Sequence, residues 1–178
     1  MSALAGAAIM TRIREVLEDG AGSVRAITAN TYAGGLSSVT NANALGIRSM
    51  IKPRVESRII EMRPHPASPP IGGSLVLRSV TVDVRIVRAF TGRHELNDAT
   101  RDALHAVAST DADVVAQALT WPGNLTATSA AAPTGLVSGC LRYASSSLGT
   151  VEADGASDGR IVTTHRFTGI ARITAAVT

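Results

Sequence analysis

The stretch from Leu75 to Phe90, LVLRSVTVDVRIVRAF, constrains the fold more than any other part of this 178-residue chain. Its residues Val80, Val82, Val84 and Ile86 alternate with polar residues, which is the period of a strand with one buried face. About ten such residues span roughly 33 Å, long enough for the central strand of a sheet in a domain of this size. The sequence therefore predicts a core strand whose Val/Ile face is covered by other elements.

The composition fits one globular domain over residues 1–178, because 45% of the residues are hydrophobic and 17% are charged. Aromatic residues make up only 3% of the chain, so the core must consist of Val, Ile, Leu and Ala, and we expect a stabilising partner. The single cysteine, Cys140, excludes an intramolecular disulfide and a Cys-based zinc site. Residues 1–8 lack a basic segment, so no signal peptide or membrane span is expected.

Two regions show helical periodicity. Residues 2–19 place Ala5, Ile9 and Ile13 on one face, which predicts an amphipathic helix. A second helix is predicted to begin at residues 97–98 and to run to about residue 108. A new start signal follows at Ser109, so the sequence predicts either two short helices or one helix broken near Ser109.

Further strands are predicted at residues 24–28 and 54–62, and a C-terminal antiparallel hairpin at residues 136–148 and 160–174. The order of elements indicates an α+β domain with a mostly antiparallel sheet and helices packed on one face. Residues 63–74 are rich in proline and are predicted to connect two strands.

Two long neutral loops are predicted as excursions from the domain, at residues 30–50 and 122–135. Their small, uncharged residues are expected to bury little surface by themselves. We therefore expect both loops to be poorly ordered in an isolated subunit, with fast hydrogen exchange.

No catalytic or metal-binding constellation occurs. Asp111 and Asp113 suit a hard cation, but we interpret them as acids that complement a helix dipole. The four histidines show no zinc-ligand spacing, and no phosphate-binding glycine loop or nucleophile elbow is present. The sequence predicts neither an enzyme nor a cofactor.

Arginine is the notable chemical feature, since sixteen of the seventeen cations are Arg. Residues 1–95 contain 12 Lys/Arg against 7 Asp/Glu, whereas residues 96–178 contain 5 against 7. The arginines of the predicted strands are candidates to face DNA in a channel, to pair with acids of a neighbouring subunit, or to form a solvated sheet face. The candidate interface or channel-facing residues are Arg54, Arg58, Arg63, Arg85 and Arg88.

The layout as a whole resembles the tail-terminator, or tail-completion, proteins of long-tailed bacteriophages. The points of similarity are the N-terminal helix ending in IREVLEDG, the uncharged loop after a first strand, and the long strand SVTVDVRIVRAF. They continue with the helical segments DATRDALHAV and DADVVAQAL and the final pair around CLRYASSS and RIVTTHRFTGIARIT.

This resemblance implies a structural virion protein, assembled in the host cytoplasm, whose copies form a ring, usually of six subunits. The ring ends tail-tube polymerisation at the head-proximal end and joins the tail to the head connector. The implied partners are the tail tube protein, the connector or stopper protein, and DNA that passes through the channel without sequence-specific contacts. A head-side adaptor or stopper of the neck remains an alternative within this class.

The rival from another class is a basic nucleic-acid-binding module, and below it stands a hydrolase with a scattered site. The low aromatic content argues against a platform for stacking single-stranded bases. No predicted helix concentrates arginine on one face for reading a groove.

Overall fold

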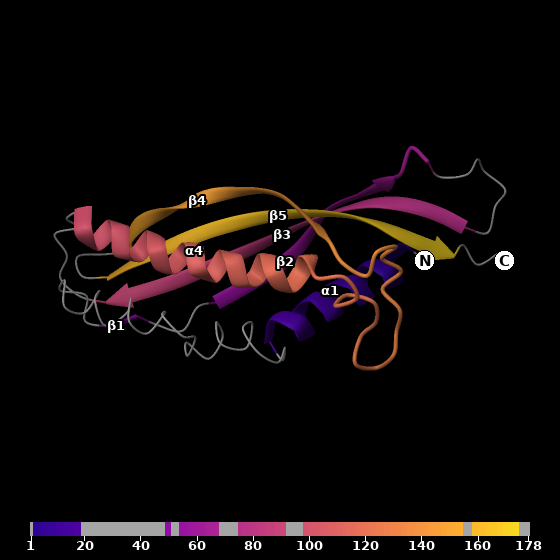
Figure 1. Ribbon diagram of the computed structural model, residues 1–178, viewed down its shortest axis with the longest axis horizontal. Helices are drawn as coiled ribbons and strands as arrows, with labels where there is room; N and C mark the ends of the chain where they lie inside the picture. The colour runs from indigo at the N-terminus through magenta and orange to yellow at the C-terminus, as the bar shows by residue number, and fades with distance from the viewer. Residues whose placement is uncertain are drawn as a thin grey trace.

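The computed structural model describes residues 2–18, 49–50, 54–67, 75–91, 98–154 and 158–174. Within these ranges the chain forms two helices and one five-stranded antiparallel sheet (Figure 1). The elements in chain order are α1 (Ser2–Glu18), β1 (Ser49–Met50), β2 (Arg54–Pro64), β3 (Leu75–Thr91), α4 (Asp98–Thr120), β4 (Arg142–Asp154) and β5 (Asp158–Thr174). The predicted α+β class, with helices on one face of the sheet, is confirmed.

Strands β3 and β5 form the middle of the sheet. They pair antiparallel along their whole length, from Leu75 opposite Thr174 to Thr91 opposite Asp158. Strand β2 and the two-residue β1 pair with the other edge of β3, and β4 pairs with the other edge of β5. The predicted central position of residues 75–90 is therefore confirmed.

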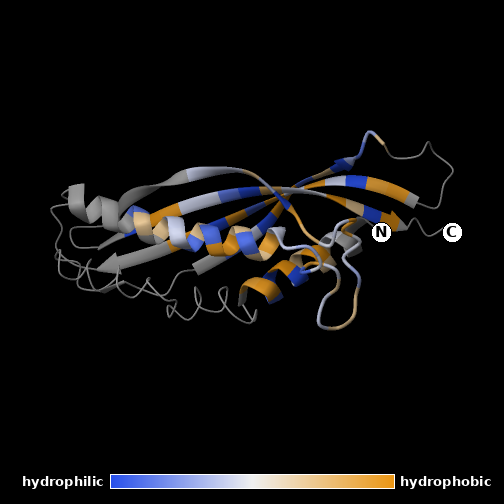
Figure 2. Ribbon diagram, viewed as in Figure 1, coloured by the Kyte–Doolittle hydropathy of each residue, from blue (hydrophilic) through white to orange (hydrophobic). Residues whose placement is uncertain are grey.

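The apolar face of β3 is buried as predicted. Val80, Val82, Val84 and Ile86 are at most 2% exposed, and they form one core with side chains of β5 and of both helices. Figure 1 shows α1 and α4 on the same side of the sheet, and Figure 2 shows apolar and polar positions alternating around each helix. The helices supply the cover that the β3 pattern requires.

The predicted break near Ser109 is wrong, because α4 is one continuous helix from Asp98 to Thr120. Its buried residues keep the helical spacing across this point, as Ala108, Asp111 and Val115 show. The hydroxyl of Thr110 donates to the carbonyl oxygen of Ala106 at 3.0 Å, one turn earlier. Ser109 and Thr110 therefore lie inside one helix and do not cap a new one.

The C-terminal hairpin is confirmed, but its first strand begins at Arg142 and not at residue 136. Before that point Leu136 forms only an isolated bridge with Ala171. Strand β2 confirms the strand predicted at residues 54–62. The strand predicted at residues 24–28, most of the loop at 30–50 and residues 68–74 of the proline-rich connection lie outside the described residues.

The expectation that residues 122–135 bury little surface is wrong. Leu125 and Thr134 are fully buried, and the Thr134 hydroxyl donates to the carbonyl oxygens of Leu125 and Thr126. The carboxylate of Glu15 in α1 accepts hydrogen bonds from the backbone NH and the hydroxyl of Ser129, at 2.9 and 2.8 Å, which lowers the pKa of Glu15. Local hydrogen bonds and an anchor on α1 thus give this loop a core that its neutral composition does not reveal.

Candidate functional site

The face of the sheet opposite the helices is polar around the middle of β3, and we call this face the open face. It consists of the residues that alternate with the buried ones, such as Thr81, Asp83 and Arg85 on β3. Antiparallel register places residues of the neighbouring strands beside them in rows that cross the sheet.

One row crosses all four long strands. It runs from Arg58 on β2 through Asp83 on β3 and Arg166 on β5 to Ser145 on β4. Arg166 donates to Asp83 with Nε at 2.9 Å from Oδ1 and Nη2 at 3.2 Å from Oδ2, which is a bidentate ion pair. This pair raises the pKa of Arg166, and the side chain of Asp83 is only 7% exposed.

The adjacent row contains Glu56, Arg85, Thr164 and Ser147. Arg85 Nη1 lies 3.6 Å from Glu56 Oε2, a loose pair between two partly exposed side chains. At the other end of the row, a β-bulge follows Ser147, whose hydroxyl accepts from the backbone NH of Thr164 at 3.3 Å. Such exposed pairs stabilise a fold only slightly. The side chains of this row can therefore exchange their partners for groups of another molecule.

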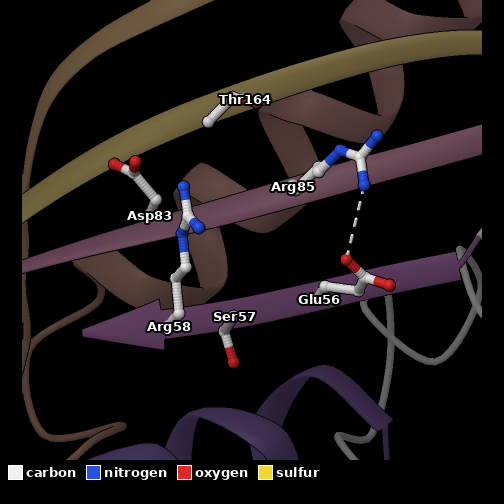
Figure 3. A pocket seen from close by; sticks show the side chains of 6 residues that line it. All are labelled: Glu56, Ser57, Arg58, Asp83, Arg85 and Thr164. Atoms are coloured by element: carbon white, nitrogen blue, oxygen red, sulfur yellow. Dashed lines mark ion pairs between the residues drawn. The ribbon is translucent and has the colours of Figure 1, made fainter. Parts of the chain in front are cut away.

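A hollow of about 350 Å³ lies between the two rows, and Figure 3 shows the side chains around it. Arg58 extends from β2 toward β3 in this view, beside Asp83. Arg85 is paired with Glu56 and Asp83 with Arg166, whereas Arg58 has no hydrogen bond or ion pair within the described part of the chain. The hollow therefore presents one uncommitted guanidinium, which is the group that binds carboxylates and phosphates in a bidentate manner.

The structure brings together only part of the predicted arginine set. Arg58 and Arg85 line the hollow, and Arg63 lies on the same face, 3.6 Å from Glu61 in an exposed pair. Arg54 lies opposite Val87 in the sheet, at a position that belongs to the open face. Arg88 pairs with Ile161 and shares the parity of buried Ile86, so the five arginines do not share one face.

The side chains of Arg54 and Arg88 lie outside the described residues. The sequence analysis did not predict three charged residues at or beside the hollow, namely Glu56, Asp83 and Arg166. The alternation of β3 is a signal for Asp83, but no pattern links it to a residue 83 positions away.

The described residues include no group of three or more His, Cys, Asp or Glu that is suited to a metal ion. Within the same ranges, neither helix has the length and apolar character needed to cross a membrane.

On the helix-covered face, His165 is 3% exposed and neither of its ring nitrogens has a hydrogen-bond partner among the described residues. Burial lowers the pKa of His165, and the charge of Asp113 opposes this shift in part. The histidine is therefore neutral in the folded protein at a pH where the unfolded chain already binds a proton.

We expect the stability of the protein to fall as the pH drops below about 6.5, because the unfolded state then binds the proton that the folded state excludes. His165→Leu should flatten this acid dependence and leave stability at neutral pH unchanged or higher, since no hydrogen bond is lost. Urea unfolding at neutral and mildly acidic pH measures both effects. The control is His105→Gln on the exposed side of α4, which should keep the acid dependence. An unchanged slope in His165→Leu would exclude His165 as its source.

No protein-family model and no curated protein matches this chain.

Proposed function

We propose that this protein is a non-enzymatic structural protein of a long-tailed bacteriophage virion. In this proposal its copies form a ring, of six subunits, at the head-proximal end of the tail tube. The ring ends tube polymerisation and joins the tail to the head connector, and DNA passes through its channel. The proposal rests on the resemblance in layout together with the surfaces of the fold.

The observation that carries the proposal is the contrast between the two sides of the domain. One side of the sheet is covered by α1 and α4, and the other is the open face with its rows of paired and unpaired charges. A ring needs two different surfaces on each subunit, which meet head to tail and close by rotation. Among the described residues the helices cover one side of the sheet only, so the domain supplies two such surfaces.

The charges of the open face favour a protein partner over nucleic acid. Glu56, Asp83 and Glu61 lie among its arginines, so a continuous phosphate backbone would meet carboxylates as well as guanidinium groups. Mixed charges suit a protein surface with its own pattern of charges. We therefore assign the open face to protein contacts and DNA to passage through the channel without sequence-specific contacts.

The test is assembly of the purified full chain, followed by light scattering over a range of protein and salt concentrations. We expect association that rises with protein concentration and weakens at high salt, because charged contacts are screened. Electron microscopy should show closed rings in the protein alone and a cap at one end of tail tubes to which it is added. A chain that stays monomeric under all these conditions and leaves tube ends bare would contradict the proposal.

A further inference from the structure

Exposed residues on α4 and just after its end form a row that winds by about 40° around the helix at each four-residue step, and we call this row the α4 stripe. Its members are four positions apart: His105, Ser109, Asp113, Gln117 and Trp121. The backbone NH of Trp121 donates to the carbonyl oxygen of Gln117 at 3.1 Å, so the helical spacing continues to the tryptophan. The stripe lies on the side of the molecule away from the open face, because α4 packs on the opposite side of the sheet.

Trp121 is the single tryptophan of the chain, and it is 60% exposed. Large exposed aromatics are the residue type that most often anchors a protein interface. Asp113, two turns before it, is exposed and has no ion pair among the described residues. The α4 stripe thus combines an apolar anchor with an unpaired carboxylate.

The open face has a complementary pair of features. Arg58 is the uncommitted cation of the hollow, in the cross-strand row of Arg166. Farther along β5, Ile170 is 37% exposed, and beside it Val137 is 54% exposed, joined to β5 by the hydrogen bond from its backbone NH to the carbonyl oxygen of Ile170. This apolar pair is the site on the open face that fits an aromatic ring.

The spacings of the two surfaces are compatible with a helix that crosses the sheet obliquely. Asp113 and Trp121 are eight residues apart on a helix, which corresponds to about 12 Å along its axis. Arg166 and Ile170 are four residues apart on a strand, which corresponds to about 13 Å. Arg58 lies two strands away from Arg166 in the same row, so it is about 16 Å from Ile170. The side chains of Asp113 and Trp121 diverge by about 80° around the helix, which adds a sideways separation to the roughly 12 Å along the axis. A helix that crosses the sheet obliquely from β2 to β5 can therefore place its carboxylate at the hollow and its tryptophan at the apolar pair.

We propose that the α4 stripe of one copy docks on the open face of the next copy of this chain. Asp113 pairs with Arg58 in the hollow, and Trp121 covers Val137 and Ile170. The contact joins two different surfaces, so it is heterologous, as a closed ring requires. This inference rests on the proposed function for the ring, and it names the residues that would hold the ring together.

The test uses charge reversal in the full chain. Arg58→Asp and Asp113→Arg should each weaken self-association by about tenfold or more, because each places like charges in contact. The double variant should recover most of the loss, since it restores an opposite-charge pair with its direction reversed. Arg14→Asp on α1 is the matched control: it makes the same charge change at an exposed arginine outside both proposed surfaces, and it should have a small effect.

The single tryptophan gives a direct readout. Its fluorescence should shift to the blue as the wild-type protein associates, and Arg58→Asp should require a correspondingly higher concentration for the shift. Trp121→Ala should weaken association by about tenfold or more, as expected of an anchor residue. Thermal unfolding of each variant checks the fold, which should be preserved because Arg58, Asp113 and Trp121 are all exposed.

The outcomes separate the two proposals. If rings form and cap tail tubes but the charge and tryptophan variants associate like wild type, the docking contact is wrong and the proposed function stands. If association depends on these residues but tube ends stay bare, the contact stands and the proposed function fails. A monomeric wild type overturns both. Loss of duplex-DNA binding in Arg58→Asp, with association unchanged, would make the hollow a phosphate site and overturn the contact.

Discussion

Val82→Asp is expected to lower the free energy of unfolding by several kcal/mol. Val82 is fully buried in the middle of β3, between Ile59 on β2 and Phe167 on β5 in the sheet register. A carboxylate there would have no partner, and an uncompensated buried charge costs about 3–5 kcal/mol. This is a large part of the roughly 5–15 kcal/mol by which domains are stable.

The matched control is Thr81→Asp, one position earlier on the same strand. Thr81 points to the open face, where an added carboxylate remains partly hydrated. Urea unfolding followed by circular dichroism should show a large loss of stability for Val82→Asp and a small change for Thr81→Asp. Equal stability of Val82→Asp and the wild type would be incompatible with the packing of this face against the helices.

The backbone frame of this domain was predictable because its strands repeat a simple pattern. The alternation in residues 75–90 identifies β3 and its buried face. The alternation in residues 136–148 and 160–174, with a polar turn between them, identifies the β4–β5 hairpin. These are local signals, since each strand shows its own face through a period of two. The packing of helices on one side of the sheet was predictable because the apolar face of β3 must be buried by another layer.

Features that depend on contacts between distant segments were not predictable. The pair of Asp83 and Arg166 joins two strands whose register the sequence does not display. The same limit applies to residues 122–135, whose anchor on Glu15 lies 114 positions away from Ser129. The predicted break in α4 is wrong for a local reason, because Ser109 and Thr110 resemble a helix cap. The helical spacing of the buried residues of α4 outweighs that signal.

The arginine set shows how register decides the chemistry of a sheet. Arg85 and Arg88 are three positions apart on β3, so alternation assigns them to opposite faces. Arg58 and Arg85 come from different strands but meet at one hollow, because β2 and β3 pair with Glu56 opposite Arg85 and Arg58 opposite Asp83. A surface of a sheet thus groups residues by parity and register, and the density of arginine along the chain does not reveal that grouping.

Phe167→Ala is expected to have the second-largest effect on stability. Phe167 is fully buried on β5, and it is among the largest fully buried side chains of the described core. Because the chain has only two phenylalanines, few other rings fill such space. Truncation of a buried phenylalanine to alanine costs about 3–5 kcal/mol through lost burial and the cavity left behind.

The ring of Phe167 also positions Tyr143 on the edge strand β4. The two rings lie 5.6 Å apart between centroids in an edge-to-face arrangement, with an interplanar angle of 77°. Phe167→Leu is the conservative control, because it keeps an apolar side chain of similar reach and should cost less than the alanine variant. Chemical unfolding measures the two losses, and near-ultraviolet circular dichroism of the tyrosine region reports the loss of the ring contact. If Phe167→Ala were no less stable than Phe167→Leu, the close packing of β5 against the helices would be wrong.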